Sequence, residues 1–214
     1  SLVEDVSTAT AIGLTIEPAE GDDPAPADAH VLAGDVVDGT ATLTVDHPAA
    51  LGVDLSTAAG EFVLATPTSA VTDDELSGVW FIKLSPTRAG LELPELPAGW
   101  VYEGWAVIDG QPISTGRFTD PGQADEFNGF SGTDASGPAY PGEDFIQNAP
   151  DGLTFPTDLT GSTVVISVEP ADDDSPAPFA FKPLAAEVPA GIGDHEAIVL
   201  GQGPALPTGE ATLG

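Results

Sequence analysis

The stretch that most constrains the fold is residues 99–118, with the sequence GWVYEGWAVIDGQPISTGRF. Apolar and aromatic side chains alternate along its first half, and this period of two is typical of a β-strand. Asp109-Gly110 follows directly, and this dipeptide favours a two-residue hairpin turn because both positions tolerate a positive φ. Residues 112–118 then predict the returning strand. We therefore expect an antiparallel hairpin at the centre of a β-sheet.

Short apolar stretches recur along the chain, separated by segments rich in glycine, proline and aspartate. They predict further strands at residues 9–17, 31–32, 40–46, 61–66, 79–84, 163–169 and 196–200. Residues 119–160 form the longest irregular region, which we expect aromatic side chains to hold in place. The spacing of these strands predicts an all-β fold, made of one or more β-sandwich units with Greek-key-like antiparallel sheets, long Gly/Pro/Asp loops and negligible helix.

An internal repeat links two distant parts of the chain. Residues 14–39 and 166–191 align without gaps at a constant offset of 152, with 11 of 26 positions identical. Such self-similarity indicates a duplicated unit. The aromatic hairpin precedes the second copy, whereas no such hairpin precedes the first. We therefore expect a partial first β unit at residues 1–75, lacking its aromatic hairpin, and a complete second β-sandwich unit at residues 76–214.

Three motifs carry a resemblance to a known family: YEGW at residues 102–105, DGQPISTGRF at 109–118 and ISVEPADDDSPAPF at 166–179. Their order is similar to that of the extracytoplasmic domain of the anti-sigma-K factor family, including secreted bacterial relatives with duplicated YEGW…VEP units. The resemblance implies a β-rich fold and an extracellular, cell-surface or periplasmic location. The sequence shows neither the sigma-binding helices nor the membrane span of a true anti-sigma factor, so we expect no sigma-factor partner.

The chain is strongly acidic, with 35 Asp and Glu against 4 Lys and Arg and a formal net charge of −31. This charge repels nucleic acids and anionic membrane surfaces, so we expect neither as a partner. Two interpretations of the acidity remain open. One is a halophilic protein, because concentrated salt screens the repulsion between its own charges. The other is a calcium-rich exterior, where carboxylates bind cations.

The acidic loops of the repeat contain the candidate calcium ligands. They are Asp172, Asp173 and Asp174 in the second copy and Asp22 and Asp23 in the first. Carboxylate oxygens suit calcium, although neither loop has the spacing of an EF-hand. A solvated acidic loop is the alternative interpretation. We expect no cofactor apart from this possible Ca²⁺.

The aromatic residues predict a core rather than a binding surface. At strand spacing we expect Trp80, Trp100, Tyr102, Trp105 and Phe118 to be buried, with a sugar-stacking platform as the alternative. Glu103 shares a strand face with Trp105. We therefore expect a buried carboxylate that pairs with Arg117 across the hairpin.

The sequence shows no nucleophile elbow, no phosphate loop and no histidine pair with metal-ligand spacing, so we expect a protein that is not an enzyme. The missing hairpin of the first unit predicts an open sheet edge that residues 9–17 or 205–213 of a neighbour can complete. This indicates an exported structural or surface protein that self-assembles into a filament or layer by strand exchange. Two alternatives remain: a monomeric extracytoplasmic sensing or ligand-binding module, and a calcium- or glycan-binding module.

Overall fold

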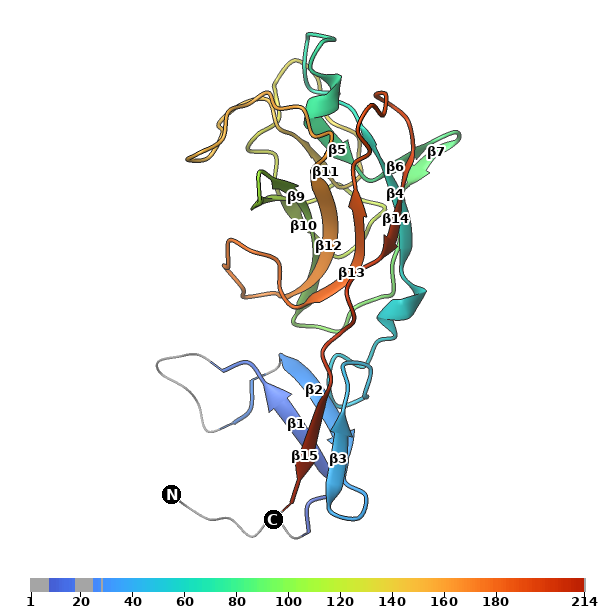
Figure 1. Ribbon diagram of the computed structural model, residues 1–214, viewed down its shortest axis with the longest axis vertical. Coiled ribbons are helices and arrows are strands. Elements are labelled where there is room, and N and C mark those ends of the chain that lie inside the picture. The colour runs from blue at the N-terminus through green and yellow to red at the C-terminus, as the bar shows by residue number, and fades with distance from the viewer. Residues whose placement is uncertain (1–7, 18–24, 28, 214) are drawn as a thin grey trace.

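The computed structural model describes residues 8–17, 25–27 and 29–213. These residues form strands β1–β15 and two single-turn 3₁₀ helices, η1 (Leu55–Thr57) and η2 (Glu75–Ser77). The predicted all-β fold is confirmed. The strands lie in two groups, a large one above and a small one below in Figure 1, which we call the large module and the small module.

The large module is a nine-stranded antiparallel sheet in the order β10-β9-β12-β13-β14-β4-β5-β11, with β8 beside β4. Its strands are β4 (Ala59–Leu64), β5 (Gly78–Trp80), β8 (Leu91–Glu92), β9 (Trp100–Ile108), β10 (Gln111–Phe118), β11 (Gly142–Asp144), β12 (Thr163–Pro170), β13 (Phe181–Glu187) and β14 (Ile198–Gln202). The sheet curves until β10 and β11 approach each other, so it forms a nearly closed barrel. A separate hairpin is made by β6 (Ile82–Leu84) and β7 (Thr87–Ala89).

The predicted hairpin at residues 99–118 is confirmed as β9 and β10. Ile108 pairs with Gln111, and the two turn residues between them have positive φ, 52° at Asp109 and 82° at Gly110. The Asp-Gly sequence permits this turn because the glycine has no side chain to oppose the left-handed conformation. The hairpin lies against β12, which pairs with β9 from Thr163 to Pro170.

The small module contains β1 (Ala11–Thr15), β2 (His30–Asp35), β3 (Thr40–Leu43) and the C-terminal strand β15 (Gly209–Thr212). β1 pairs with β2, and β15 pairs with β3. Ala33 and Thr44 exchange two backbone hydrogen bonds and so join the two pairs of strands. Leu32, Leu43 and Val45 are buried between them and continue into the core of the large module.

The two copies of the sequence repeat form hairpins with the same register. In the small module Ile12 is opposite Gly34 and Leu14 is opposite Leu32. In the large module the partners are Val164 with Ala186 and Ile166 with Leu184, each 152 residues later. A register shift follows in both copies, directly after Leu14 and Ile166. The repeat is therefore a repeat of structure.

The expected division of the chain at residue 75 stays a prediction. The strands on either side of it, β4 and β5, are neighbours in one sheet, where Val63 pairs with Trp80 and Leu64 with Val79. The chain also crosses between the modules twice, from β3 to β4 and from β14 to β15 (Figure 1). The small module thus combines strands from the two ends of the described chain, whereas the large module is formed by one continuous segment, residues 59–202.

Candidate functional site

The aromatic face of the β9–β10 hairpin belongs to the core of the large module. Trp100 stacks on Phe181 with ring centroids 5.6 Å apart, and Tyr102 stacks on Phe118 at 5.8 Å. The Tyr102 hydroxyl donates a 2.7 Å hydrogen bond to the Pro94 carbonyl, and burial raises the pKa of this hydroxyl. The five aromatic residues singled out in the sequence, Trp80, Trp100, Tyr102, Trp105 and Phe118, are all buried.

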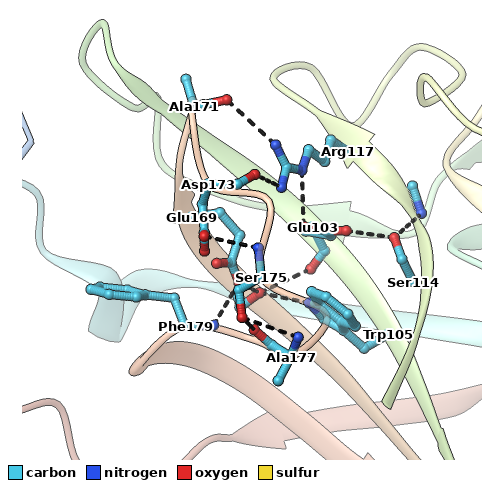
Figure 2. Close-up of polar contacts among 12 residues, drawn as sticks. Glu103, Trp105, Ser114, Arg117, Glu169, Ala171, Asp173, Ser175, Ala177 and Phe179 are labelled. Carbon is cyan, nitrogen blue, oxygen red and sulfur yellow. Dashed lines mark hydrogen bonds and ion pairs between the residues drawn. The ribbon is translucent and has the colours of Figure 1, made fainter. Parts of the chain in front are cut away.

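The opposite face of the same hairpin carries a polar network, shown in Figure 2. Glu103 is buried, and its carboxylate accepts hydrogen bonds from Arg117 Nε at 3.1 Å and from the Ser114 hydroxyl at 2.5 Å. The Arg117 guanidinium also donates to the carbonyls of Ala171 and Asp173. A buried carboxylate needs such partners, because its desolvation is otherwise very costly. Arg117 therefore joins the hairpin to the acidic loop that follows β12.

Glu169, at the end of β12, holds the base of this acidic loop. Its carboxylate accepts a hydrogen bond from the Ser167 hydroxyl and a 2.8 Å bond from the backbone N–H of Phe179. The Ser167 hydroxyl in turn accepts a 2.8 Å bond from the Trp105 indole N–H. Burial raises the pKa of Glu169 to about 7.

The same arrangement recurs in the small module. The Glu17 carboxylate accepts a hydrogen bond from the Thr15 hydroxyl and a 3.0 Å bond from the backbone N–H of Ala27. Glu17, Thr15 and Ala27 each lie 152 residues before Glu169, Ser167 and Phe179. The glutamate of the repeated Glu-Pro…Pro-Ala-Pro motif thus has the same role in both copies, since it accepts a hydrogen bond from the residue that follows Pro-Ala-Pro.

The candidate calcium ligands of the second copy lie in the loop that Glu169 closes. Asp172 and Asp174 are exposed, and Asp173 Oδ1 accepts a 3.0 Å bond from the backbone N–H of Ser175. Asp22 and Asp23 lie outside the described residues. Within the described ranges, no group of three or more His, Cys, Asp or Glu side chains is arranged to hold a metal ion. Calcium binding stays a prediction.

A second buried acidic cluster, which sequence reasoning missed, lies in β11 and the long loop before it. Asp144 accepts hydrogen bonds from the Trp80 indole at 2.6 Å, and from both the backbone N–H, at 2.9 Å, and the hydroxyl of Thr68. Glu143 accepts from the Ser131 hydroxyl and, at 3.0 Å, from the backbone N–H of Asp144. Both carboxylates are fully buried.

Asp125 lies in the loop that spans the opening of the barrel between β10 and β11, the two ends of the sheet. Its carboxylate accepts a 2.7 Å bond from the backbone N–H of Gly142 on β11. The backbone N–H of the next residue, Glu126, donates a 3.0 Å bond to the Arg117 carbonyl on β10. The loop therefore bridges the two ends of the nine-stranded sheet. A hollow of about 380 Å³ beside it is lined by Trp80, Asp125 and Tyr140, among others. These carboxylates accept hydrogen bonds from backbone and side-chain groups of the protein, and so they stabilise the fold.

The raised pKa values predict that stability falls with rising pH. Burial raises the pKa of Glu143 and of Glu169 to about 7, from an ordinary 4.5. The protonated carboxyl groups therefore stabilise the fold fully below about pH 4.5, and this contribution is lost as the pH rises through about 7. We expect the free energy of unfolding to be larger at pH 5 than at pH 8, by about 1–2 kcal/mol for each group.

Denaturant titrations of Glu169→Gln check this expectation, because glutamine keeps an acceptor for the Phe179 N–H but cannot ionise. The variant is expected to show a flatter dependence of unfolding free energy on pH than the wild type in the same salt. Glu187→Gln, which removes an exposed carboxylate, is the matched control for the general acidity. Equal slopes for wild type and Glu169→Gln would refute the assignment.

The edge strand β15 provides the clearest candidate for an interaction site, because it takes the place in the small module that β4 takes in the large one. Gly209-Glu210-Ala211 pairs with Leu43, Thr42 and Ala41. In the large module Gly60-Glu61-Phe62 pairs with Leu200, Val199 and Ile198. Leu43 and Leu200 occupy the same position, since Ala33 lies opposite Thr44 and its repeat partner Ala185 lies opposite Gly201. The Gly-Glu dipeptide thus has the same register in both modules.

No protein-family model, curated protein or solved structure matches this chain. The resemblance to the anti-sigma-K extracytoplasmic domain therefore stays a prediction. Among the described residues, no helix has the length and apolar character required to span a membrane.

Proposed function

We propose that this chain is an exported, non-enzymatic structural protein whose copies join by exchanging strand β15. The observation that carries the proposal is the register of β15 in the small module. In the small module, a strand from the C-terminal end of the chain occupies the place beside β3. In the large module the same place belongs to β4, which precedes every other strand of its sheet in the sequence. Both modules have a Gly-Glu strand at this position, and in the small module it comes from a distant segment of the sequence.

The contacts that hold β15 are the same whether β3 belongs to its own chain or to a second copy. Exchange of an identical element is therefore a low-cost route to association, governed by concentration and by the connecting segment. That segment, residues 203–208, contains Pro204 and Pro207, which favour an extended path. Each chain supplies one donor strand and one acceptor edge. Repeated exchange in one direction produces an open head-to-tail assembly.

The acidity of the chain sets the conditions for this assembly. Copies with a formal charge of −31 repel one another over about 10 Å at 0.1 M salt, but over only about 3 Å at 1 M salt. A saline exterior therefore favours association, in agreement with the exported location that the anti-sigma-K resemblance implies. The buried carboxylates of Asp144 and Glu169 accept hydrogen bonds that stabilise the fold, which supports a structural rather than catalytic role.

Light scattering over a concentration series at about 1 M salt tests the proposal. We expect the average mass of the wild type to rise with concentration, and to remain that of a monomer for Ala211→Pro. Leu213 N–H donates to Gly39 at 2.8 Å, so by strand alternation Ala211 N–H also faces β3 while Glu210 N–H faces away. Glu210→Pro is therefore the matched control and is expected to assemble. A wild type that stays monomeric at all concentrations would refute exchange.

A further inference from the structure

The outer edge of β1 differs from the corresponding edge of its repeat partner. In the large module β12 pairs with β13 on one side and with β9 on the other. In the small module β1 pairs, within the described residues, with β2 alone. The small module thus matches the large one strand for strand in β1, β2, β3 and β15, but the described chain provides no counterpart of β9.

The backbone of β1 is oriented for a further strand. Val36 N–H donates to the Thr10 carbonyl at 2.9 Å, and the repeat partners Val188 and Ser162 make the same 2.9 Å bond. By antiparallel alternation, the N–H and C=O groups of Ala11 and Gly13 point away from β2. The corresponding residues of the large module, Thr163 and Val165, lie opposite Val107 and Trp105 of β9.

Among the described residues, the apolar side chains at the end of β1 and directly after it are more exposed than their repeat partners. Leu14 and Ile16 are 45% and 37% exposed, whereas their repeat partners Ile166 and Val168 are fully buried. In the large module these two partners lie opposite Gly104 and Tyr102 of β9. Exposed apolar side chains beside an unpaired strand edge are typical of a site that receives an added strand.

We propose that the outer edge of β1 binds an aromatic β-hairpin of the β9–β10 type, supplied by another polypeptide. The register of the repeat defines this partner: a Trp-like residue opposite Gly13, a glycine opposite Leu14 and a Tyr-like residue opposite Ile16, with a Glu–Arg pair like that of Glu103 and Arg117 on its outer face. The proposal rests on the proposed function, since it too treats the small module as an incomplete copy of the large one.

A backbone-cyclised peptide of residues 99–118 is the probe, because an isolated linear hairpin is only marginally stable in water. It is titrated into the intact, ¹⁵N-labelled protein at about 1 M salt, where charge repulsion is screened, and at a protein concentration below that at which light scattering detects association through β15. We expect saturable binding, shifts of the Ala11, Gly13 and Thr15 amide signals, and at least tenfold slower hydrogen exchange at Gly13. A peptide N-methylated at Trp105, whose N–H faces β12 in the parent module, is expected to bind at least tenfold more weakly.

Protein variants locate the site. Leu14→Ser and Ile16→Ser change exposed side chains, so the fold is expected to persist, and each is expected to weaken peptide binding at least tenfold. Val199→Ser, at a 71% exposed position on β14, is the matched control and is expected to bind like the wild type. The amide spectrum of each variant reports its fold.

Three outcomes would overturn the proposal: no saturable binding up to about 1 mM peptide, binding that maps to the free edge of β10, or association of the wild type through β1 with no peptide present. The last result would assign the edge to a second copy of the chain. Exchange of β15 is measured separately, by mass and by cross-linking at β3. Failure of the peptide with persistent β15 exchange would therefore reject the β1 site and leave the proposed function standing.

Discussion

Replacement of Asp144 by alanine is expected to destabilise the protein by about 3–5 kcal/mol, the largest effect we predict for any single carboxylate. The Asp144 carboxylate accepts hydrogen bonds from the Trp80 indole, at 2.6 Å, and from the backbone N–H, at 2.9 Å, and hydroxyl of Thr68. Alanine would leave the indole and the backbone N–H buried without an acceptor, and each such group costs about 1–3 kcal/mol.

The effect of Asp144→Ala is expected to extend to the closure of the barrel. Thr68 also receives hydrogen bonds from the long loop, from Gly132 N–H to its hydroxyl at 2.7 Å and from Asp134 N–H to its carbonyl at 3.3 Å. Loss of Asp144 therefore loosens the segment that bridges β10 and β11. Chemical denaturation followed by tryptophan fluorescence measures the change in unfolding free energy.

Asp134→Ala, which removes an exposed carboxylate in the same loop, is the matched control and is expected to cost less than about 0.5 kcal/mol. Asp144→Asn is expected to lie between the two, since its carbonyl oxygen still accepts a hydrogen bond. An Asp144→Ala protein as stable as the control would show that the buried network contributes nothing to the fold.

The features predicted correctly from the sequence are local ones. The β9–β10 hairpin depends on the Asp109-Gly110 turn and on alternation within one stretch, so neighbouring residues determine it. The predicted strand at residues 79–84 is instead divided into β5 and β6 at Phe81. There the backbone N–H donates to the Pro141 carbonyl at 3.0 Å while the carbonyl accepts from Gly90 at 2.8 Å. Pro141 is 60 residues away in the sequence, and no local pattern indicates either partner.

Strands β7, β8, β11, β13 and β15 lie outside the predicted strands, although residues 205–213 were expected to donate a strand to a neighbour. The physical reasons differ for β13 and β15. β13 contains Pro183, which lacks the N–H of a strand residue, and the sheet tolerates it at a position where its carbonyl accepts from Gly203 at 2.9 Å. β15 has the sequence GEAT, with no apolar alternation. Its place is determined by the edge of β3, and only the shared Gly-Glu of β4 and β15 connects the two strands in the sequence.

Apart from Glu103, the buried acids could not be identified individually among 35 acidic residues. Glu143-Asp144 is followed directly by Phe145 and Ile146, an apolar neighbourhood that was the one available signal. The acidic triplet at residues 172–174 was predicted as a cation site. In the structure, the carboxylates whose pKa is raised by burial include Glu143 and Glu169. Burial, which distinguishes these groups, depends on tertiary packing that a single sequence does not show.

The central proposal is that β15 exchanges between copies at the edge of β3, and a pair of cysteine variants tests it most directly. Glu210 and Thr42 lie opposite each other in β15 and β3, and both are exposed. By strand alternation they form a non-hydrogen-bonded pair, whose Cα separation of about 4.5 Å suits a disulfide. The chain contains no cysteine of its own, so Thr42→Cys and Glu210→Cys introduce the only thiols.

The two single variants are mixed at high concentration and about 1 M salt, oxidised and analysed by non-reducing electrophoresis. Exchange predicts a disulfide-linked heterodimer as the main product. Val199→Cys replaces Thr42→Cys in the matched control, because Val199 holds the same position on β14 but already faces Glu61 of β4. A heterodimer from Thr42→Cys with Glu210→Cys, absent with Val199→Cys, is the result we expect. Equal yields in the two mixtures, or none in either, would contradict strand exchange.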